Sequence, residues 1–171
     1  MNNLMKASLL AAALCPALAL AVPVAGENEV TLSGAGSSDK DFNDTSFSIQ
    51  GSWGKYLSEA SLLGIRQTIG MRDTEEDSFK VNGSTRVFYD YHFGSGKARP
   101  FIGASIGGIY GDGVEDTFMA GPELGVKYWV LDKAFIQGIV EYQFLFKSGS
   151  EAKDRFDDGA LFYSVGLGMN F

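Results

Sequence analysis

The sequence is poor in cysteine, histidine and proline, and it has no long apolar run beyond its first 21 residues. The only cysteine, Cys15, lies in that first stretch, so no disulfide is expected in the rest of the chain. Lipidation of Cys15 is disfavoured because Leu14 precedes it where a small residue is needed. Without a further run of about 20 apolar residues, a membrane-spanning helix is excluded. With a single histidine, His92, no His/Cys cluster has the spacing of metal ligands.

Basic residues are also scarce. The chain has 14 Lys and Arg against 21 Asp and Glu, and its formal net charge is −7. A chain of this charge is a poor partner for the phosphate backbone of nucleic acid. An exported domain of about 150 residues without disulfides must instead be stabilised by buried apolar surface or by a membrane.

The N-terminal stretch has the pattern of a secretory signal peptide. Lys6 is followed by the apolar segment ASLLAAALCPALALA, which ends in small residues at the two positions that a signal peptidase reads. The sequence therefore predicts residues 1–21 as a signal peptide and residues 22–171 as one mature domain. Cleavage after Ala19 or Ala25 is the alternative.

The mature region is dominated by alternation of large apolar residues with small or polar ones. Side chains alternate between the two faces of a β-strand, so this period of two predicts strands. Eight segments show it: residues 28–36, 45–56, 61–72, 79–93, 99–110, 117–130, 134–147 and 159–171. The 22 glycines and a mean hydropathy near zero fit strands whose apolar and polar halves cancel in any window average.

The connections between these segments alternate in length and charge. Three are short turns, at residues 57–60, 94–98 and 131–133. The other four are longer or more acidic and hold 14 of the 21 acidic residues: 37–44, 73–78, 111–116 and 148–158. Short turns at one end and longer loops at the other are typical of antiparallel barrels in bacterial outer membranes, with both termini at the short-turn end.

The composition of the two strand faces indicates which of them points outward. A soluble barrel would carry many Lys and Glu on its surface, but the polar parity here is mostly Gly, Ser, Ala, Thr and Gln. The apolar parity is too bulky for the narrow interior of an eight-stranded barrel, which small residues and a few paired charges would fill. We therefore predict an all-β fold: an eight-stranded antiparallel transmembrane up-and-down β-barrel with its apolar parity facing lipid.

Five charged residues share the inward parity and predict a polar network in the lumen. They are Arg66, Arg86, Glu123, Lys127 and Glu141. Unpaired charges in so narrow an interior would cost several kcal/mol each, so both signs should pair across strands. In an ideal hairpin around the turn at 131–133, Glu123 opposes Glu141 directly and needs a basic residue between the two. Lys127 reaches Glu141 only diagonally.

The last strand ends on a bare phenylalanine. Its apolar parity comprises Tyr163, Val165, Leu167, Met169 and Phe171. This pattern resembles the C-terminal assembly signal of outer-membrane proteins, a terminal Phe preceded by alternating apolar residues. The resemblance implies contacts with periplasmic chaperones and recognition by the barrel-assembly machinery.

Two internal stretches extend the resemblance. RPFIGASIGGIYG, followed by GPELGVKYWVLDKAFIQGIVEYQFLF, is similar to the small bacterial outer-membrane β-barrel family that includes opacity proteins and OmpA-like barrel domains. The matching elements are Pro100 to Gly107, Gly125 to Asp132 and Tyr142 to Phe144. The resemblance implies a monomer in the outer membrane of a Gram-negative bacterium, in contact with its lipids and lipopolysaccharide. It is a match of fold and carries little about function.

Three functional hypotheses remain at the level of sequence. The first is a structural or surface-interaction barrel without catalysis, and the second is a small channel or ligand-binding transport barrel. The third is a lipid A-modifying enzyme, whose site would need a Ser/His-type constellation near the outer rim. His92 is expected at the periplasmic end instead, so no enzyme activity, catalytic residue, cofactor or metal site is predicted. Acidic stretches at 111–116 and 154–159 leave weak divalent-ion binding open.

Overall fold

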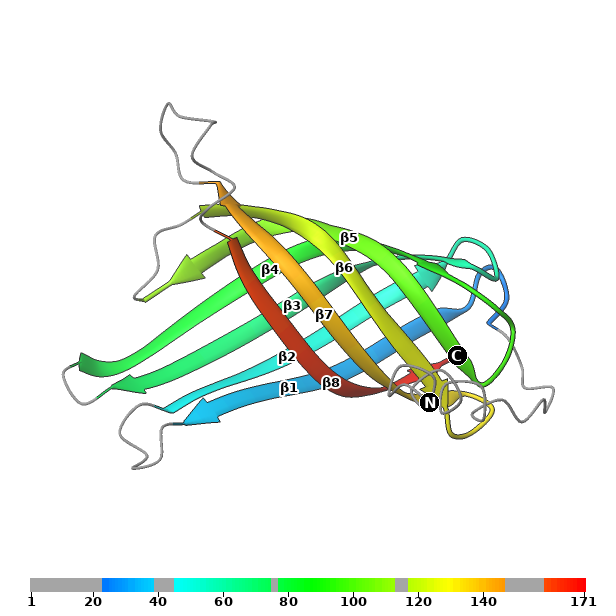
Figure 1. Ribbon diagram of the computed structural model, residues 1–171, viewed down its shortest axis with the longest axis horizontal. Helices are drawn as coiled ribbons and strands as arrows, with labels where there is room; N and C mark the ends of the chain where they lie inside the picture. The colour runs from blue at the N-terminus through cyan, green and yellow to red at the C-terminus, as the bar shows by residue number, and fades with distance from the viewer. Residues whose placement is uncertain (1–22, 39–44, 75–76, 113–116, 147–158) are drawn as a thin grey trace, which may run out of the picture.

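The computed structural model describes residues 23–38, 45–74, 77–112, 117–146 and 159–171, which form one closed antiparallel barrel (Figure 1). Each strand pairs with its neighbours in sequence, and β8 pairs with β1 to close the ring. The strands are β1 (Asn28–Ser38), β2 (Thr45–Tyr56), β3 (Ser61–Thr74), β4 (Asp77–His92), β5 (Ala98–Gly111), β6 (Thr117–Trp129), β7 (Ala134–Phe146) and β8 (Gly159–Asn170). The predicted fold class is confirmed: the barrel has eight antiparallel strands in up-and-down order.

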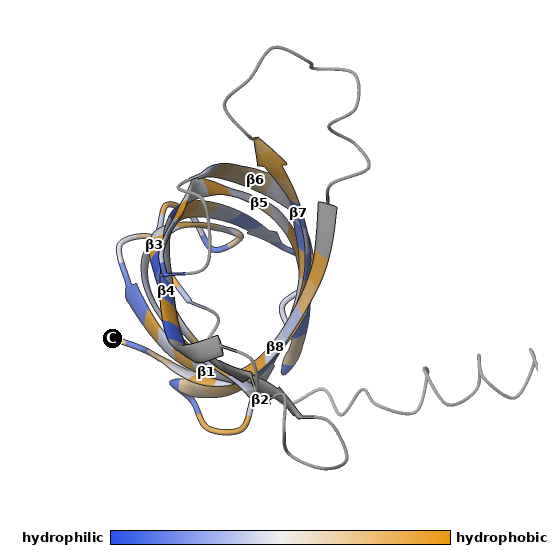
Figure 2. Ribbon diagram, turned by 90° about the vertical axis from the view of Figure 1, so that its left-hand side faces the viewer, coloured by the Kyte–Doolittle hydropathy of each residue, from blue (hydrophilic) through white to orange (hydrophobic). Residues whose placement is uncertain are grey.

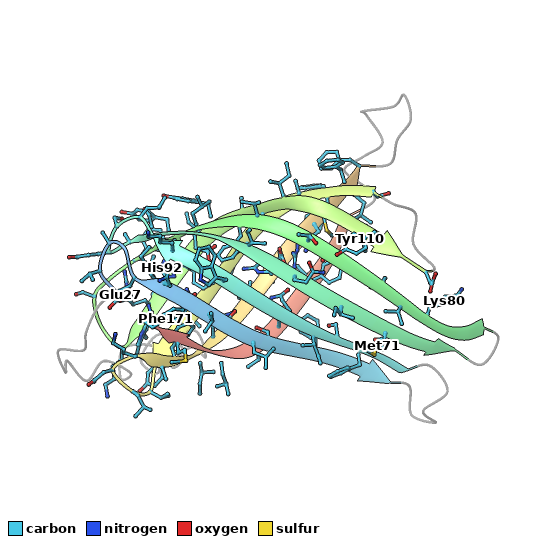
Figure 3. All side chains as sticks on the ribbon, turned by 180° about the vertical axis from the view of Figure 1, so that it is seen from behind. Glu27, Met71, Lys80, His92, Tyr110 and Phe171 are labelled. Carbon is cyan, nitrogen blue, oxygen red and sulfur yellow. The ribbon has the colours of Figure 1, made fainter. Side chains whose placement is uncertain are left out.

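The two ends of the barrel differ, and we name them by their connections. The turn end carries the short turns at 57–60, 93–97 and 130–133, and the loop end carries the other connections. The last residue, Phe171, lies at the turn end, where its backbone exchanges two hydrogen bonds of 2.8 and 2.9 Å with Asn28. Figure 3 shows Phe171, Glu27 and His92 at the turn end, and Tyr110 toward the loop end.

The outer wall is apolar, as alternation along each strand requires. Seen along the barrel, the ribbon shows polar and apolar residues alternating within strands around a closed ring (Figure 2). Large apolar side chains are exposed on all eight strands, among them Leu32, Trp53, Ile65, Val87, Ile102, Leu124, Ile136 and Val165. Polar and charged side chains, by contrast, are buried inside the ring. The distribution of polar and apolar side chains is therefore the reverse of that in a soluble barrel.

One predicted loop is shorter than expected. The sequence predicts a loop over the acidic stretch 73–78, but β3 continues to Thr74, β4 begins at Asp77, and these two residues pair across the strands. Alternation alone did not reveal this extension because charged residues are common near strand ends. The predicted signal peptide and most of the other three acidic loops lie outside the described residues.

A polar residue on the outer wall is satisfied by its neighbours. The Gln67 amide donates a hydrogen bond of 2.8 Å to the Tyr110 hydroxyl, and the Thr85 hydroxyl donates one of 2.6 Å to the Gln67 carbonyl oxygen. The Tyr110 ring covers Gly83, where a β-carbon would come within 2.7 Å of the ring. The three side chains therefore form a closed polar cluster that presents no unpaired group to the surroundings.

Candidate functional site in the barrel interior

A charge network crosses the middle of the lumen. The Arg66 guanidinium donates hydrogen bonds of 2.7 and 3.0 Å to the two carboxylate oxygens of Glu123, and it lies 3.4 Å from Glu141. Glu141 also accepts from Arg86 and, at 2.8 Å, from the Ser105 hydroxyl. Glu123 and Glu141 oppose each other in the β6–β7 ladder, so Arg66 supplies the basic group between two facing carboxylates.

Lys127, the fifth residue of the predicted network, lies in a separate cluster. It faces Gln137 in the β6–β7 ladder, and its ammonium group lies 2.6 and 2.8 Å from the carboxylate oxygens of Glu29 on β1. The expected diagonal approach of Lys127 to Glu141 is therefore wrong. The lumen of an eight-stranded barrel is narrow, so side chains from β6 and β1, which are not neighbouring strands, can meet across it. Hairpin geometry describes contacts between neighbouring strands only.

Lys127 is also surrounded by aromatic rings. Its ammonium nitrogen lies 5.2–5.7 Å from the ring centroids of Tyr56, Phe101 and Phe135. At these distances each ring face attracts the cation. The Tyr56 hydroxyl donates a hydrogen bond of 2.8 Å to Glu29, so ring, cation and carboxylate hold one another in place.

These rings belong to a layer of buried, mostly aromatic side chains, here called the aromatic layer, that fills the turn end of the lumen. Its buried members are Tyr56, Leu62, Phe88, Phe101, Trp129 and Phe135. The expectation that only small residues and paired charges occupy the interior is wrong here. Large rings fit because inward-facing glycines oppose them in the ladders: Phe88 faces Gly64, Phe101 faces Gly125 and Phe135 faces Gly168. A β-carbon at each of these glycines would overlap the facing ring.

Arg99 helps to cover the turn end. Its guanidinium donates hydrogen bonds of 3.0 and 2.7 Å to the backbone carbonyl oxygens of Gly94 and Glu59, which lie in two different turns. The predicted charge network did not include Arg99, Glu29 and Asp90, which are also buried in the interior. Their parity within β5, β1 and β4 was the available signal, since each is in step with inward-facing neighbours.

The buried charges balance. Four basic and four acidic side chains are buried among the described residues: Arg66, Arg86, Arg99, Lys127, Glu29, Asp90, Glu123 and Glu141. Six of them form the pairs Arg66–Glu123, Arg86–Glu141 and Lys127–Glu29, and an opposite charge at this distance allows ionised groups to persist away from bulk water. Arg99 instead donates to backbone carbonyl oxygens. The middle and the turn end of the lumen are thus occupied by a network of paired charges and by an aromatic layer.

The loop end of the lumen contains a cavity of about 150 Å³. Its polar wall is formed by Ser33, Ser48, Gln50, Thr68, Asn82, Ser84 and Gln143, with Arg86 and Glu141 below them. Its apolar wall is formed by Ile109, Met119, Ile139 and Phe162. The Arg86 guanidinium donates a hydrogen bond of 2.9 Å to Gln50, which fixes both groups at the base of the cavity. This space is large enough to admit a small molecule or several waters.

The residues of the predicted C-terminal assembly signal all lie on the outer wall of β8 and at its end. Tyr163, Val165, Leu167, Met169 and Phe171 are each exposed, from 71% for Tyr163 to 49% for Met169. Leu167 and Met169 pair with Leu32 and Val30 of β1, so the signal coincides with the strand that closes the barrel.

His92 lies in the aromatic layer at the turn end. It is buried, its Nδ1 atom is 3.1 Å from the carbonyl oxygen of Ala60, and its ring packs 5.2 Å from Phe101. Within the described part of the chain, no group of His, Cys, Asp and Glu residues is arranged to hold a metal ion. The described residues also include no helix that is both long and apolar enough to cross a membrane.

Comparison with solved structures identifies the same architecture in outer-membrane proteins. The N-terminal β-barrel domain of Pseudomonas aeruginosa OprF matches 87% of this chain and 100% of its own length, with a TM-score of 0.60 and 19% identity. Neisserial surface protein A matches 85% of this chain and 96% of its own, with a TM-score of 0.57 and 17% identity. A de novo designed transmembrane β-barrel covers 87% of this chain and 98% of its own, with a TM-score of 0.50 and 13% identity.

The likeness is confined to the fold. No protein-family model matches the sequence, and no curated protein does. At identities below 20%, the structural matches do not transfer a function. The predicted resemblance is confirmed at this level: the chain has the fold of the small eight-stranded outer-membrane β-barrels.

Proposed function

We propose that this chain is an integral outer-membrane β-barrel of a Gram-negative bacterium with a structural or surface-interaction role, and that it neither catalyses a reaction nor conducts ions. The location is supported by the exposed apolar side chains on every strand, which would be unfavourable in water at this density. It is also supported by the fold shared with OprF and Neisserial surface protein A. The turn end then faces the periplasm and the loop end faces outward.

One observation carries the proposal of a closed lumen. The aromatic layer and the Lys127–Glu29 pair occupy the turn end, and the Arg66–Glu123 pair lies beside them, with Phe88 under the Arg66 guanidinium at 4.6 Å. Hydrated ions would have to displace buried aromatic rings and paired charges together. Glycines line the barrel wall opposite these rings. The lumen is therefore plugged by side chains and not by backbone.

The absence of catalysis is supported by the placement of the reactive groups. His92, the chain's only histidine, is packed among rings at the turn end, away from the loop-end cavity. The described cavity lining contains hydroxyl and amide groups but no histidine to activate them. A lipid A-modifying enzyme would need such a pair near the outer rim.

Planar-bilayer recording of the purified protein tests the proposal. We expect no steady conductance above the bilayer background, whereas a water-filled porin inserted in the same membrane conducts. The variant Phe101→Ala/Phe135→Ala should admit current because it removes two rings of the plug. Steady single-channel currents from the unmodified barrel would favour the channel hypothesis. Altered lipid A masses in cells that overproduce the protein would favour the enzyme hypothesis.

A further inference from the structure

The loop-end cavity has a polar side and an apolar side, and different strands supply them. Strands β1 to β4, which form one half of the ring, supply hydroxyl and amide groups: Ser33, Ser48, Gln50, Thr68, Asn82 and Ser84. Strands β5 to β8, which form the other half, supply the apolar side chains of Ile109, Met119, Ile139 and Phe162. A ligand that fits this space therefore has hydrogen-bonding groups on one side and an apolar surface on the other.

The ring of Phe162 is covered much less than the rings of the aromatic layer. Phe162 pairs with the buried Glu141 in the β7–β8 ladder and lines the cavity, yet it is 47% exposed. Phe88, Phe101 and Phe135 also face inward but are at most 3% exposed. The Phe162 ring therefore keeps a free apolar surface, on which C–H groups of a ligand can pack.

The polar side of the cavity has hydrogen-bonding groups to offer. The Gln50 carbonyl oxygen accepts from the Arg86 guanidinium at 2.9 Å and from the Thr68 hydroxyl at 3.1 Å. What remains on the Gln50 side chain is the donor capacity of its amide nitrogen. The hydroxyl of Ser33 is buried in the same wall and has no hydrogen-bond partner among the described residues. Both groups suit a ligand that carries hydroxyls.

The charges at the base of the cavity are already paired. Arg86 and Glu141 form an ion pair, and Glu141 also accepts from Ser105 and lies 3.4 Å from Arg66. A charged ligand would have to compete with these contacts and would lose its own hydration. The cavity therefore favours an uncharged ligand.

The volume of the cavity limits the ligand to one small ring. One water molecule needs about 10–15 Å³ of such space, so a cavity of about 150 Å³ admits on the order of ten non-hydrogen atoms. A single hexose is of this size. In its pyranose form it carries hydroxyls around its edge and C–H groups on its faces, which matches the two sides of the cavity.

We propose that the loop-end cavity binds one neutral pyranose sugar. The sugar hydroxyls bond to the amide groups of Gln50, Asn82 and Gln143, and one C–H face of the ring packs on Phe162. The sugar stays at the loop end, because the Arg66–Glu123 pair and the aromatic layer fill the lumen below it.

This proposal goes beyond the structural role proposed above and does not depend on it. A conducting barrel could still bind the sugar, and a closed barrel could fail to bind it. Conductance and sugar binding therefore report on the two proposals separately.

Methyl NMR of the purified barrel tests the site, because isoleucine and methionine methyl groups lie on both sides of the barrel wall. Ile109, Met119 and Ile139 line the cavity, whereas Ile102 and Ile106 are exposed on the outer wall. The barrel is placed in phosphocholine micelles, since glucoside and maltoside detergents would compete. It is titrated with the methyl glycosides of glucose, galactose and mannose. With at least one of them we expect saturable shifts of the three cavity methyl groups at millimolar concentrations, and none on the outer wall.

The charge of the ligand is tested with methyl glucuronide, which has the same ring and a carboxylate. It should bind at least several-fold more weakly than the best neutral glycoside, because its carboxylate meets an Arg86 that is already paired with Glu141. Equal or tighter binding of the glucuronide would overturn the assignment of an uncharged ligand.

Two glutamines on β7 provide a matched pair of variants. Gln143 lines the cavity and is 3% exposed, whereas Gln137 is 4% exposed, faces Lys127 toward the turn end and is not part of the lining. Gln143→Leu should weaken sugar binding about tenfold, the effect of losing one or two hydrogen bonds to the ligand. Gln137→Leu should bind like the unmodified barrel, and heat-dependent gel mobility shows that both variants fold.

Phe162→Leu tests the stacking surface, because it keeps an apolar side chain but removes the ring, and it should also weaken binding several-fold. Three results would overturn the proposal: equal affinity of the folded Gln143→Leu and Gln137→Leu variants, shifts of the outer-wall methyl groups as large as those in the cavity, or no saturable shift with any of the three glycosides. The last result would mean that the cavity holds water only.

Discussion

Replacement of Glu123 by alanine should strongly destabilise the barrel. The Arg66 guanidinium is 2% exposed and forms both of its short carboxylate contacts with Glu123. Without that partner, Arg66 keeps only Glu141, at 3.4 Å, which already accepts from Arg86 and Ser105. Removing one member of a buried ion pair costs about 3–5 kcal/mol, because the remaining charge stays buried without compensation.

This loss of stability corresponds to a measurable shift in melting temperature. For a domain of this size, each 1 kcal/mol lowers the midpoint by about 2–4 °C, so Glu123→Ala should unfold about 6–20 °C below the unmodified barrel. The midpoint is read from gel mobility after heating in detergent, since a closed barrel migrates differently from the unfolded chain. Urea unfolding in lipid vesicles gives the free energy directly.

Two variants isolate the cause. Glu27→Ala removes a partly exposed ion pair, in which Lys133 is 60% and Glu27 25% exposed and the atoms are 3.8 Å apart, and should change stability by less than about 1 kcal/mol. The double variant Arg66→Met/Glu123→Leu replaces the buried pair by apolar side chains and should recover most of the loss. Two results would contradict the reasoning: equal melting midpoints for Glu123→Ala and Glu27→Ala, or a double variant that is no more stable than Glu123→Ala. Either would show that the stability of the barrel does not depend on a paired interior charge.

Strand alternation was sufficient to predict the barrel. The eight expected segments agree with the observed strands to within two residues at every end, because large apolar residues recur on the outward parity of each strand despite interruptions such as Gln67. Contacts within a ladder were equally accessible: Glu123 opposes Glu141, as the short turn at 131–133 requires. Neighbouring strands follow from turn length and register alone.

Contacts across the lumen could not be predicted in the same way. Glu29 and Lys127 are far apart in sequence and on strands that are not neighbours, so only the tilt and stagger of the closed barrel bring them together. The inner aromatic layer was missed because its residues are of the same types as those on the outer wall. Glycines face Phe88, Phe101 and Phe135 and indicate that rings fit inside the barrel. These pairings can be recognised only when the register of the strands is known.

Three further predictions test assembly, topology and packing. Deleting Phe171 should lower the level in the outer membrane more than it lowers synthesis, since the residue ends the closing strand; immunoblots showing normal membrane levels would contradict this. A tag inserted at Ser150 should be accessible to antibody on intact cells and one at Lys97 should not, and the reverse labelling would invert the topology. Gly64→Ala should lower stability by about 1–3 kcal/mol, because its β-carbon would lie 2.5 Å from a backbone oxygen and 2.6 Å from a ring of the aromatic layer. Gly51→Ala is the control, with no atom within 4 Å of its β-carbon, and should change stability by less than about 1 kcal/mol. Equal melting midpoints for these two variants would show that the inner glycines are not needed to accommodate the rings.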